Sequence, residues 1–438
     1  MKMKYTKKTK NSGSALLVSL FVCLVLSISL GSYLMLVQAQ ARKVTWSQSW
    51  NNALAVAETG AEEALAHLNP GTFVAVNPAA NGWGLPSGGM YGPITRNMGQ
   101  DQYSVVFTAQ GRPVIYSTGQ VSVVALSRTL TRVIRVTTTN LPLYTVAMVA
   151  LENIDLNGGG ILTDSFDSSN PNLSTNGFYD PSRTSTNGDI ASLGGLVEVG
   201  SASVHGDIYL GPGATDEVSK NGTVSGTTYY DFNADFPPAE LPGPVTSFIH
   251  VPAMIFPTNI NGASYSYYFG ASGDYSISGG SGNVYVAPGA KVRLYVTSSF
   301  SPSVIRVAGT GLTAGNLQLY MGGTDFRLSG QSIVDGGNAA NLGYWGLSQN
   351  TSISFSGNSS FVGTIYAPNA AFTLGGGGSS VYDFVGACVV KSVTMNGHFQ
   401  FHYDESLLRA GPVKGYSAAS WREIGGVKKI EDWSHGAL

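Results

Sequence analysis

An apolar run without charged residues near the start of the chain constrains what the rest can fold into. It extends from Ala15 to Val37, contains no proline, and follows a leader with five lysines and no acidic residue. At about 1.5 Å per residue, a helix of this length spans the roughly 30 Å of hydrocarbon in a bilayer. We therefore predict a membrane-spanning helix.

The helical pattern continues beyond the apolar run. After Arg42 and Lys43, apolar residues recur at helical spacing as far as Leu68, and Asn69-Pro70 supplies a stop signal. The sequence thus predicts a single helix over residues 14–69, about 80 Å long, with an apolar first half and an amphipathic second half. The lysines before the run orient the N-terminus inside and the bulk of the chain outside.

The leader, the apolar run and the alanine- and glutamate-rich segment 55–64 together resemble the N-terminus of type IV pilins and pseudopilins, most closely the PilX-like minor pilins. In that family a prepilin peptidase cleaves after a glycine on the cytoplasmic side of the apolar helix. The resemblance implies cleavage between Gly13 and Ser14, which makes residues 1–13 the leader. A signal peptidase would instead cleave after the run, and Ala39-Gln-Ala41 fits that alternative loosely.

The chain departs from the pilin pattern at one position. Val18 is the fifth residue after the expected cleavage, where major pilins have a glutamate thought to meet the N-terminal amine of a neighbouring subunit. An unpaired carboxylate in hydrocarbon is energetically costly. Valine at this position therefore avoids that desolvation cost and also removes the group that would pair with the neighbouring amine. Minor pseudopilins at a filament tip also lack this glutamate. Two interpretations remain open: a minor or tip subunit, and a plain anchor that never enters a filament.

Composition favours a β-rich extracellular chain. Charged residues make up 11% of the sequence and glycines number 56, which suits many tight turns. Without the five leader lysines, 19 basic residues oppose 26 acidic ones, a formal net charge of −7. A basic stripe is absent from the sequence, so we expect no nucleic-acid partner.

Residues 70–141 are expected to form a small antiparallel β region packed on the amphipathic half of the helix. The segment 71–100 is rich in glycine and proline and is predicted to be loop-like. Three β-branched or alternating segments then predict strands: Tyr103–Ala109, Val114–Val123 and Thr129–Thr138.

Residues 142–408 carry a short repeated unit in which two apolar residues alternate with others and a glycine follows. Examples are Ile154–Gly158, Phe326–Gly330, Ile353–Gly357, Phe372–Gly376 and Val393–Gly397. Short strands ending in glycine about 20 residues apart are typical of a β-solenoid, although a sandwich also gives short alternating strands. The prolines between Asp231 and Pro257 exclude a regular rung, so that segment is predicted to leave the coil.

This part also resembles the β-helical domain that often follows PilX-like N-termini in bacterial surface proteins. The resemblance rests on Asp164–Ser168, Gly363–Ala370 and Phe401–Glu405. It implies fold and location rather than a chemical activity. In the tail, residues 409–438, we expect Ser420–Glu423 either to cap the end of the solenoid as a last strand or to belong to a loose tail.

The candidate polar site consists of Asp164, Asp167, His205 and Asp207, since many parallel β-helices bind or cleave polysaccharide with carboxylates on one exposed face. Asp404 with Glu405 is a further acidic pair. Glycoside hydrolysis needs two carboxyl groups about 5–9.5 Å apart across one bond. Asp164 and Asp167 face opposite sides of a straight strand, and a lone His205–Asp207 pair is typical of a solvated polar ladder. We therefore expect at most a weak glycan site.

The sequence predicts no catalytic residue, no metal site and no cofactor. His398 and His402 have the i, i+4 spacing of a zinc pair on a helix, but on a strand they lie about 13 Å apart and are interpreted as surface residues that close the last coil. The acidic loops lack the D-x-D-x-D-G pattern of a calcium loop.

The sequence as a whole predicts a mainly β protein with a long N-terminal helix, a small antiparallel sheet and a parallel β-solenoid. The expected function is that of a non-catalytic, membrane-anchored minor pilin-like protein that contributes to type IV pilus or pseudopilus assembly or to adhesion. Expected partners are prepilin peptidase, other pilin-like subunits, the inner membrane and, as a further candidate, a surface glycan. The alternatives are an anchored polysaccharide-binding or -cleaving solenoid and a passive envelope scaffold.

Overall fold

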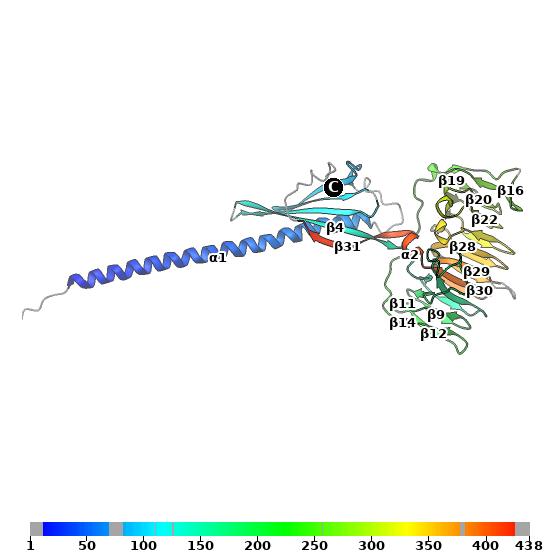
Figure 1. Ribbon diagram of the computed structural model, residues 1–438, viewed down its shortest axis with the longest axis horizontal. Coiled ribbons are helices and arrows are strands. Elements are labelled where there is room, and N and C mark those ends of the chain that lie inside the picture. Colours follow the sequence, from blue (N-terminus) through cyan, green and yellow to red (C-terminus); the bar gives the residue numbers. More distant parts are fainter. Residues whose placement is uncertain are drawn as a thin grey trace, which may run out of the picture. The chain divides into compact units, whose positions relative to one another are not determined.

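The computed structural model describes residues 12–69, 82–109, 111–124, 127–255, 257–376 and 382–424, so residues 1–11 of the leader lie outside them. The chain divides into two units (Figure 1). The first comprises residues 1–68, 78–139 and 417–438, and the second residues 69–77 and 140–416. The protein is mainly β, as predicted.

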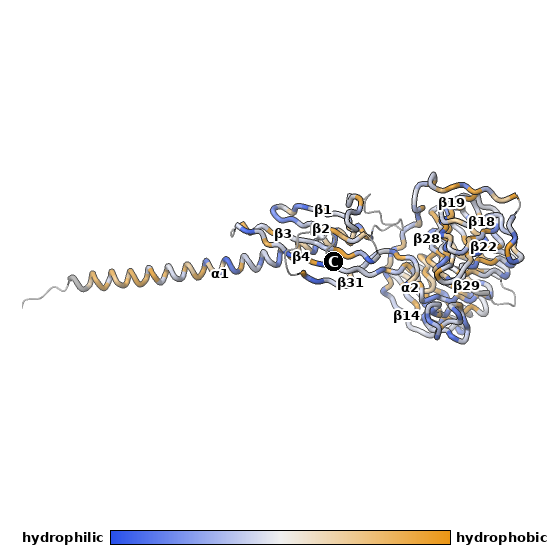
Figure 2. The backbone as a smooth tube through the Cα atoms, turned by 45° about the horizontal axis from the view of Figure 1, so that its top comes forward, coloured by the Kyte–Doolittle hydropathy of each residue, from blue (hydrophilic) through white to orange (hydrophobic). Residues whose placement is uncertain are grey.

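The first unit begins with the predicted continuous helix, α1 (Ser12–Leu68). From Ala15 to Trp50 nearly all its side chains are exposed, and most of the large ones are apolar, as the colouring of Figure 2 shows. The second half buries Ala53, Ala57, Ala61, Ala64 and Leu68. These recur at intervals of three or four residues, which places them on one face of the helix.

That buried face packs on a five-stranded sheet. The sheet order is β1 (Met90–Met98), β2 (Asp101–Thr108), β3 (Val114–Val123), β4 (Arg128–Pro142) and β31 (Val413–Glu423). The pairs from β1 to β4 are antiparallel. The backbone of Ile424 donates to Val133, and Thr137 meets Ser420, so β31 also runs antiparallel to β4.

Small residues let the helix lie close to the sheet. A Cβ atom on Gly119 of β3 would lie 2.2 Å from the carbonyl oxygen of Ala53. One on Gly60 of α1 would lie 2.3 Å from the Oγ atom of Ser117. Both positions therefore require glycine because backbone or a buried side chain fills the space.

Two strands of this sheet differ from the sequence prediction. β1 lies in the segment 71–100, which was predicted to be loop-like because it is rich in glycine and proline. The strand accommodates Pro93 because it lies at the edge of the sheet and has a register shift between Tyr91 and Ile94. Ser420–Glu423 was expected to cap the solenoid or to be loose. It belongs instead to β31 and forms the other edge of the sheet.

The second unit is a parallel β-solenoid with three faces, and most paired residues of consecutive coils lie 17 to 29 positions apart in the sequence. Two long strands, β28 (Ser360–Gly375) and β29 (Tyr382–Met395), pass through all three faces. An antiparallel hairpin of β16 (Thr258–Ile260) and β17 (Ala263–Tyr265) lies outside the coils.

The remaining strands are assigned to the faces by their parallel pairings. The first face contains β15 (Ile249–His250), β19 (Gly273–Ile277), β21 (Lys291–Val296), β23 (Asn316–Met321), β26 (Leu342–Gly346), β5 (Met148–Ala150), β8 (Ile190–Ser192), β11 (Ile208–Leu210) and β14 (Thr228–Tyr229). The second contains β24 (Asp325–Leu328), β27 (Ser352–Ser356), β6 (Ile154–Leu156), β9 (Leu196–Val199) and β12 (Thr215–Val218). The third contains β18 (Tyr267–Phe269), β20 (Val284–Val286), β22 (Val304–Val307), β25 (Ile333–Asp335), β30 (Phe399–Asp404), β7 (Leu162–Phe166), β10 (Ser203–Val204) and β13 (Thr223–Val224).

The coils do not stack in chain order. The last coil pairs with the first one, because β29 lies beside β5 and β6, and β30 lies beside β7. The stack therefore runs through residues 249–404 and continues through residues 147–229. The chain enters and leaves the solenoid in the middle of the stack, where the backbone N–H of Leu143 donates to the carbonyl of Pro412 at 2.9 Å.

Residues 231–248, which we call the strap, connect the two ends of this stack. The predicted departure from the coil over residues 231–257 is confirmed for the strap, but residues 249–250 form β15, which pairs with β19 in the coil. The strap lies along the first face. The hydroxyl of Tyr366 donates to the carbonyl of Pro237 at 2.5 Å, and Ala239 bridges to Leu347. Aromatic pairs hold both ends: Phe232 with Tyr209, and Phe248 with Tyr295.

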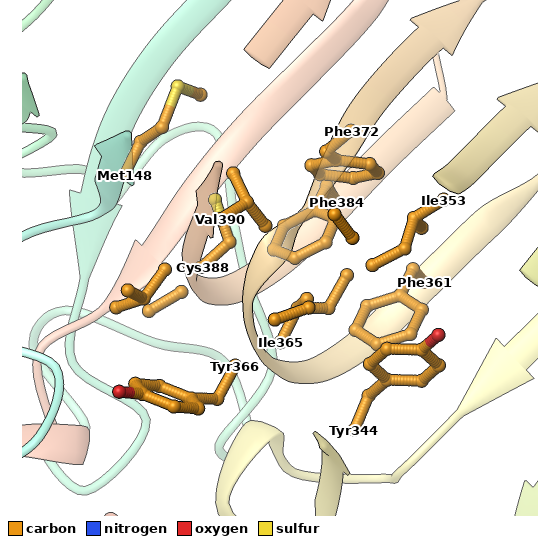
Figure 3. Packing of buried hydrophobic residues seen from close by; sticks show 14 of the residues in the cluster. Met148, Tyr344, Ile353, Phe361, Ile365, Tyr366, Phe372, Phe384, Cys388 and Val390 are labelled. Atoms are coloured by element: carbon orange, nitrogen blue, oxygen red, sulfur yellow. The ribbon is translucent and has the colours of Figure 1, made fainter. Parts of the chain in front are cut away.

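Apolar ladders fill the interior of the solenoid. The ring centroids of Phe361 and Phe384 lie 4.9 Å apart, and those of Phe384 and Phe401 lie 4.2 Å apart. Figure 3 shows Ile353, Phe361, Phe372 and Phe384 pointing into the same interior space. Each coil buries its alternate side chains only against neighbouring coils, so the stack as a whole forms the core.

Candidate functional site

The first candidate site is the apolar half of α1. The first acidic residue of the chain is Glu58, so the whole preceding helix lacks carboxylates. Its leucines, valines and other large apolar side chains are exposed, far beyond the patches that soluble surfaces tolerate. It is the one described helix long and apolar enough to cross a membrane, a property that signal sequences share. Such a surface requires an apolar environment.

The predicted processing residues lie at the start of this helix. Gly13 and Ser14 are in the first turn of α1, and Val18 is 61% exposed one turn later. The lysine-rich part of the leader, which would precede the cleaved bond, lies outside the described residues.

The second candidate site is a polar cluster on the third face, where the last coil meets the first. Asp164 of β7 lies opposite His402 of β30, and the carboxylate Oδ1 is 2.5 Å from the imidazole Nδ1. The hydroxyl of Tyr179 donates to Oδ2 of Asp164 at 2.9 Å, and its ring stacks on His402 with centroids 3.5 Å apart. Asp164 is 1% exposed and His402 0%.

The insert 167–187, between β7 and β8, brings Tyr179 over the cluster. Arg409 donates to Asp167 at 2.5 Å and to Ser169 at 2.8 Å, which fixes the start of the insert. Burial alone would raise the pKa of Asp167, but hydrogen bonds from Ser169 and Arg409 outweigh burial and hold the pKa below its usual range. The insert is thus anchored by a charged pair as well as by Tyr179.

The acidic pair Asp404 and Glu405 is likewise engaged. Oδ1 of Asp404 accepts the backbone N–H groups of Ser168 and Ser406, both at 3.0 Å. Oε1 of Glu405 accepts from Ser165 and from Asn187, both at 2.8 Å. Both carboxylates therefore fasten the insert to the chain segment that leaves the solenoid.

His205 and Asp207 lie on different parts of the coil. The β7–β10 register, continued by one residue, sets His205 beside Asp164 on the third face. Asp207 lies past the corner, where its Oδ1 accepts the backbone N–H of Thr227 at 2.7 Å. Asp189 accepts the N–H of Asp207 in the same way, so these aspartates link successive coils.

The structure therefore brings together Asp164 and His205 from the predicted polar site, and it places Asp167 and Asp207 apart from them. It adds Tyr179 and Arg409, which the sequence analysis did not select. His402 was interpreted as a surface residue, and this was wrong: it is buried, because the first coil stacks against it. His398 is half-buried, and within the described chain the His, Cys, Asp and Glu side chains form no group of three that would hold a metal.

Comparison with known proteins adds a partial family match. A family model described as a domain of unknown function (DUF7305) matches residues 269–410, about a third of the chain. Among curated proteins none matches.

Two solved structures are similar to parts of this one. The competence-associated pilin ComZ from Thermus thermophilus aligns with a TM-score of 0.31 and 12% identity, covering 85% of this chain and 96% of that one. An ice binding protein from an Antarctic bacterium, Flavobacteriaceae, aligns with a TM-score of 0.20 and 9% identity, covering 57% of this chain and 63% of that one. Both TM-scores are too low to support a fold assignment, so the fold is assigned from this chain's own structure alone.

Proposed function

We propose that this chain is a membrane-anchored, pilin-like minor subunit that displays a non-catalytic β-solenoid outside the membrane. The observation that carries the proposal is the division of α1. Its first half is apolar, exposed and free of carboxylates, and its second half packs on an antiparallel sheet through alanine and glycine. One helix thus joins a bilayer-compatible segment to a folded head without a linker.

The expected maturation step is cleavage between Gly13 and Ser14 by a prepilin peptidase. Support comes from the lysine leader and from the uninterrupted helix beyond it. A signal peptidase cut near Ala41 would divide α1 and leave the head with its amphipathic half alone. Val18 in place of a glutamate favours a minor or tip position, with other pilin-like subunits as partners of the apolar half.

A display role for the solenoid is supported by how its candidate carboxylates are used. Asp164 is buried beneath Tyr179, and Asp207 accepts a backbone N–H of the next coil. Asp164 is therefore not accessible to a polysaccharide, and one oxygen of Asp207 is already used to link neighbouring coils. A surface glycan remains a candidate ligand of the exposed faces.

The N-terminal sequence and mass of the mature protein from membranes test this proposal. We expect a chain that begins at Ser14, and we expect Gly13→Leu to retain the leader. Gly31→Ala is the matched control on the same helix, because a Cβ atom there meets nothing within 4 Å. A mature chain that begins near Gln40 or Arg42 would contradict the anchor, and an intact Met1 end would reduce the protein to a simple single-pass anchor.

A further inference from the structure

A hollow of about 580 Å³ lies beside α1 where the apolar segment ends. Its lining residues are Arg42, Lys43 and Trp46 of α1 and Arg128 of β4. All four side chains are exposed. The three cations come from two elements of the same unit, so folding of the head onto the helix brings them together.

The positive charge of this cluster is not neutralised within the described part of the chain. Arg42, Lys43 and Arg128 form no ion pair there, in contrast to Arg96 and Arg132, which bind Glu63 and Glu423. In addition, no carboxylate occurs in the sequence before Glu58. Three uncompensated cations around one hollow favour an anionic ligand that comes from outside the chain.

The position of the cluster indicates the source of that anion. Arg42 follows Val37, the last large apolar residue of the run, by five residues, or about 7 Å along a helix. The headgroup layer of a bilayer extends about 5–7 Å beyond each edge of the hydrocarbon. When the run spans a bilayer, Arg42 therefore lies at the outer edge of the lipid headgroups, and the long side chains of the cluster are within reach of the phosphates.

Aromatic and apolar side chains accompany the cations on the side away from the hydrocarbon, one and two helical turns beyond Arg42 along α1. Trp46 and Trp50 are both about two-fifths exposed and stack with centroids 6.5 Å apart. Trp50 is in turn covered by the guanidinium of Arg132 at 4.8 Å. Val124 follows Val123, which pairs with Arg128 between β3 and β4, and it is 71% exposed. Tryptophan at the interface and cations among phosphates are characteristic of membrane-contacting surfaces.

We propose that Arg42, Lys43 and Arg128, with Trp46, bind the phosphate of a phospholipid headgroup. The contact holds the β3–β4 tip of the first unit against the membrane that α1 spans, on its extracytoplasmic face, while the subunit is still in the bilayer. This inference rests on the proposed membrane anchor and adds a lipid partner to it.

The test uses the full-length chain in nanodiscs of phosphatidylcholine, with or without phosphatidylglycerol. A fluorophore is attached to Val124→Cys in a Cys23→Ser background, because Cys388 is fully buried. Headgroup-spin-labelled lipid reports contact by quenching. We expect strong quenching that increases with phosphatidylglycerol, and we expect the triple variant Arg42→Gln, Lys43→Gln, Arg128→Gln to reduce it at least twofold.

Arg112→Gln is the matched control, because Arg112 is equally exposed but precedes β3, at the opposite end of that strand. It should be quenched like the unmodified chain. If the triple variant and the unmodified chain were quenched equally, the inference would be overturned, even if the triple variant no longer assembled with other subunits. Release of the contact by inorganic phosphate would assign the cluster to free phosphate. Failure of the chain to enter nanodiscs would overturn the proposed anchor as well.

Discussion

At the scale of single residues, the buried Asp164–His402 contact predicts that Asp164 stabilises the solenoid. Asp164→Ala removes an acceptor of both Tyr179 and His402, and the His402 side chain is fully buried. Breaking a buried pair in this way costs about 3 kcal/mol or more. We expect the thermal midpoint of the full-length protein in detergent to fall by several degrees.

The matched control is Asp335→Asn on the same outward column of the third face. Asp335 pairs with Arg306 at 3.5 Å, and both side chains are about one-third exposed. Exposed pairs contribute about 0–1 kcal/mol, so this variant should change the midpoint little. If Asp164→Ala were as mild as Asp335→Asn, the buried cluster would have no structural role, and a functional role for Asp164 would gain weight.

Glycine at the helix–sheet contact gives a second residue-scale prediction. Gly119→Val adds atoms where the backbone of Ala53 and Ala57 already lies. Overpacking of this kind costs about 1–3 kcal/mol, so α1 should pack less tightly on the sheet. Limited proteolysis between Ala53 and Leu68 should become faster. Gly31→Ala on the same helix serves as control, and equal proteolysis of both variants would show that the close approach is dispensable.

The residue scale is also where sequence reasoning reached its limit. The pattern of apolar side chains predicted α1 and three strands of the small sheet because helix and strand periods are local properties. The contact between Asp164 and His402 joins residues 238 positions apart, and nothing near either residue indicates the other. Tyr179 was overlooked for the same reason, since its role depends on how the insert folds back over β30.

At the scale of elements, the attachment of β31 should depend on pH. Arg132 donates to Glu423, and this hydrogen bond lowers the pKa of the Glu423 carboxyl below its ordinary value of 4.5. A depressed pKa means that the stabilisation is complete above about pH 4.5 and is lost as the pH falls through the folded value. β31 should therefore loosen in acid.

The measurement is the difference in thermal midpoint between the unmodified chain and Glu423→Gln, taken at pH 6 and at pH 3. The difference should be larger at pH 6, because protonation of Glu423 towards pH 3 takes from the unmodified chain the ion pair that Glu423→Gln lacks at every pH. Glu62→Gln is the control, since Glu62 is exposed and forms no ion pair with the described residues. A difference that is constant with pH would exclude the Arg132–Glu423 pair as the acid-sensitive link.

β31 also illustrates why the order of elements was harder to predict than their type. Its sequence fits the edge of any sheet with a free neighbour, whether a solenoid end or β4. The choice is made by Arg132 and Thr137, which lie nearly 300 residues earlier in the chain. The coils pose the same problem: each rung satisfies the same apolar pattern whichever rung it stacks on, so the sequence indicated a solenoid without its stacking order.

At the scale of the whole molecule, the stacking order predicts that the solenoid does not need the strap to be continuous. The two parts of the stack are joined by the pairings of β29 with β5 and β6 and of β30 with β7. A protease site inserted between Val245 and Thr246, both exposed, cuts the strap after folding. We expect the nicked protein to elute as one species under native conditions and to separate only in denaturant.

The same site inserted at Leu312, in an exposed loop between consecutive strands β22 and β23, controls for the insertion itself. After denaturation, the strap-nicked chain should recover its structure at a rate that depends on protein concentration, because its two pieces must meet again. The uncut protein should refold independently of concentration. Separation of the strap-nicked pieces under native conditions would mean that the strap, rather than the strand pairing in the middle of the stack, holds the solenoid together.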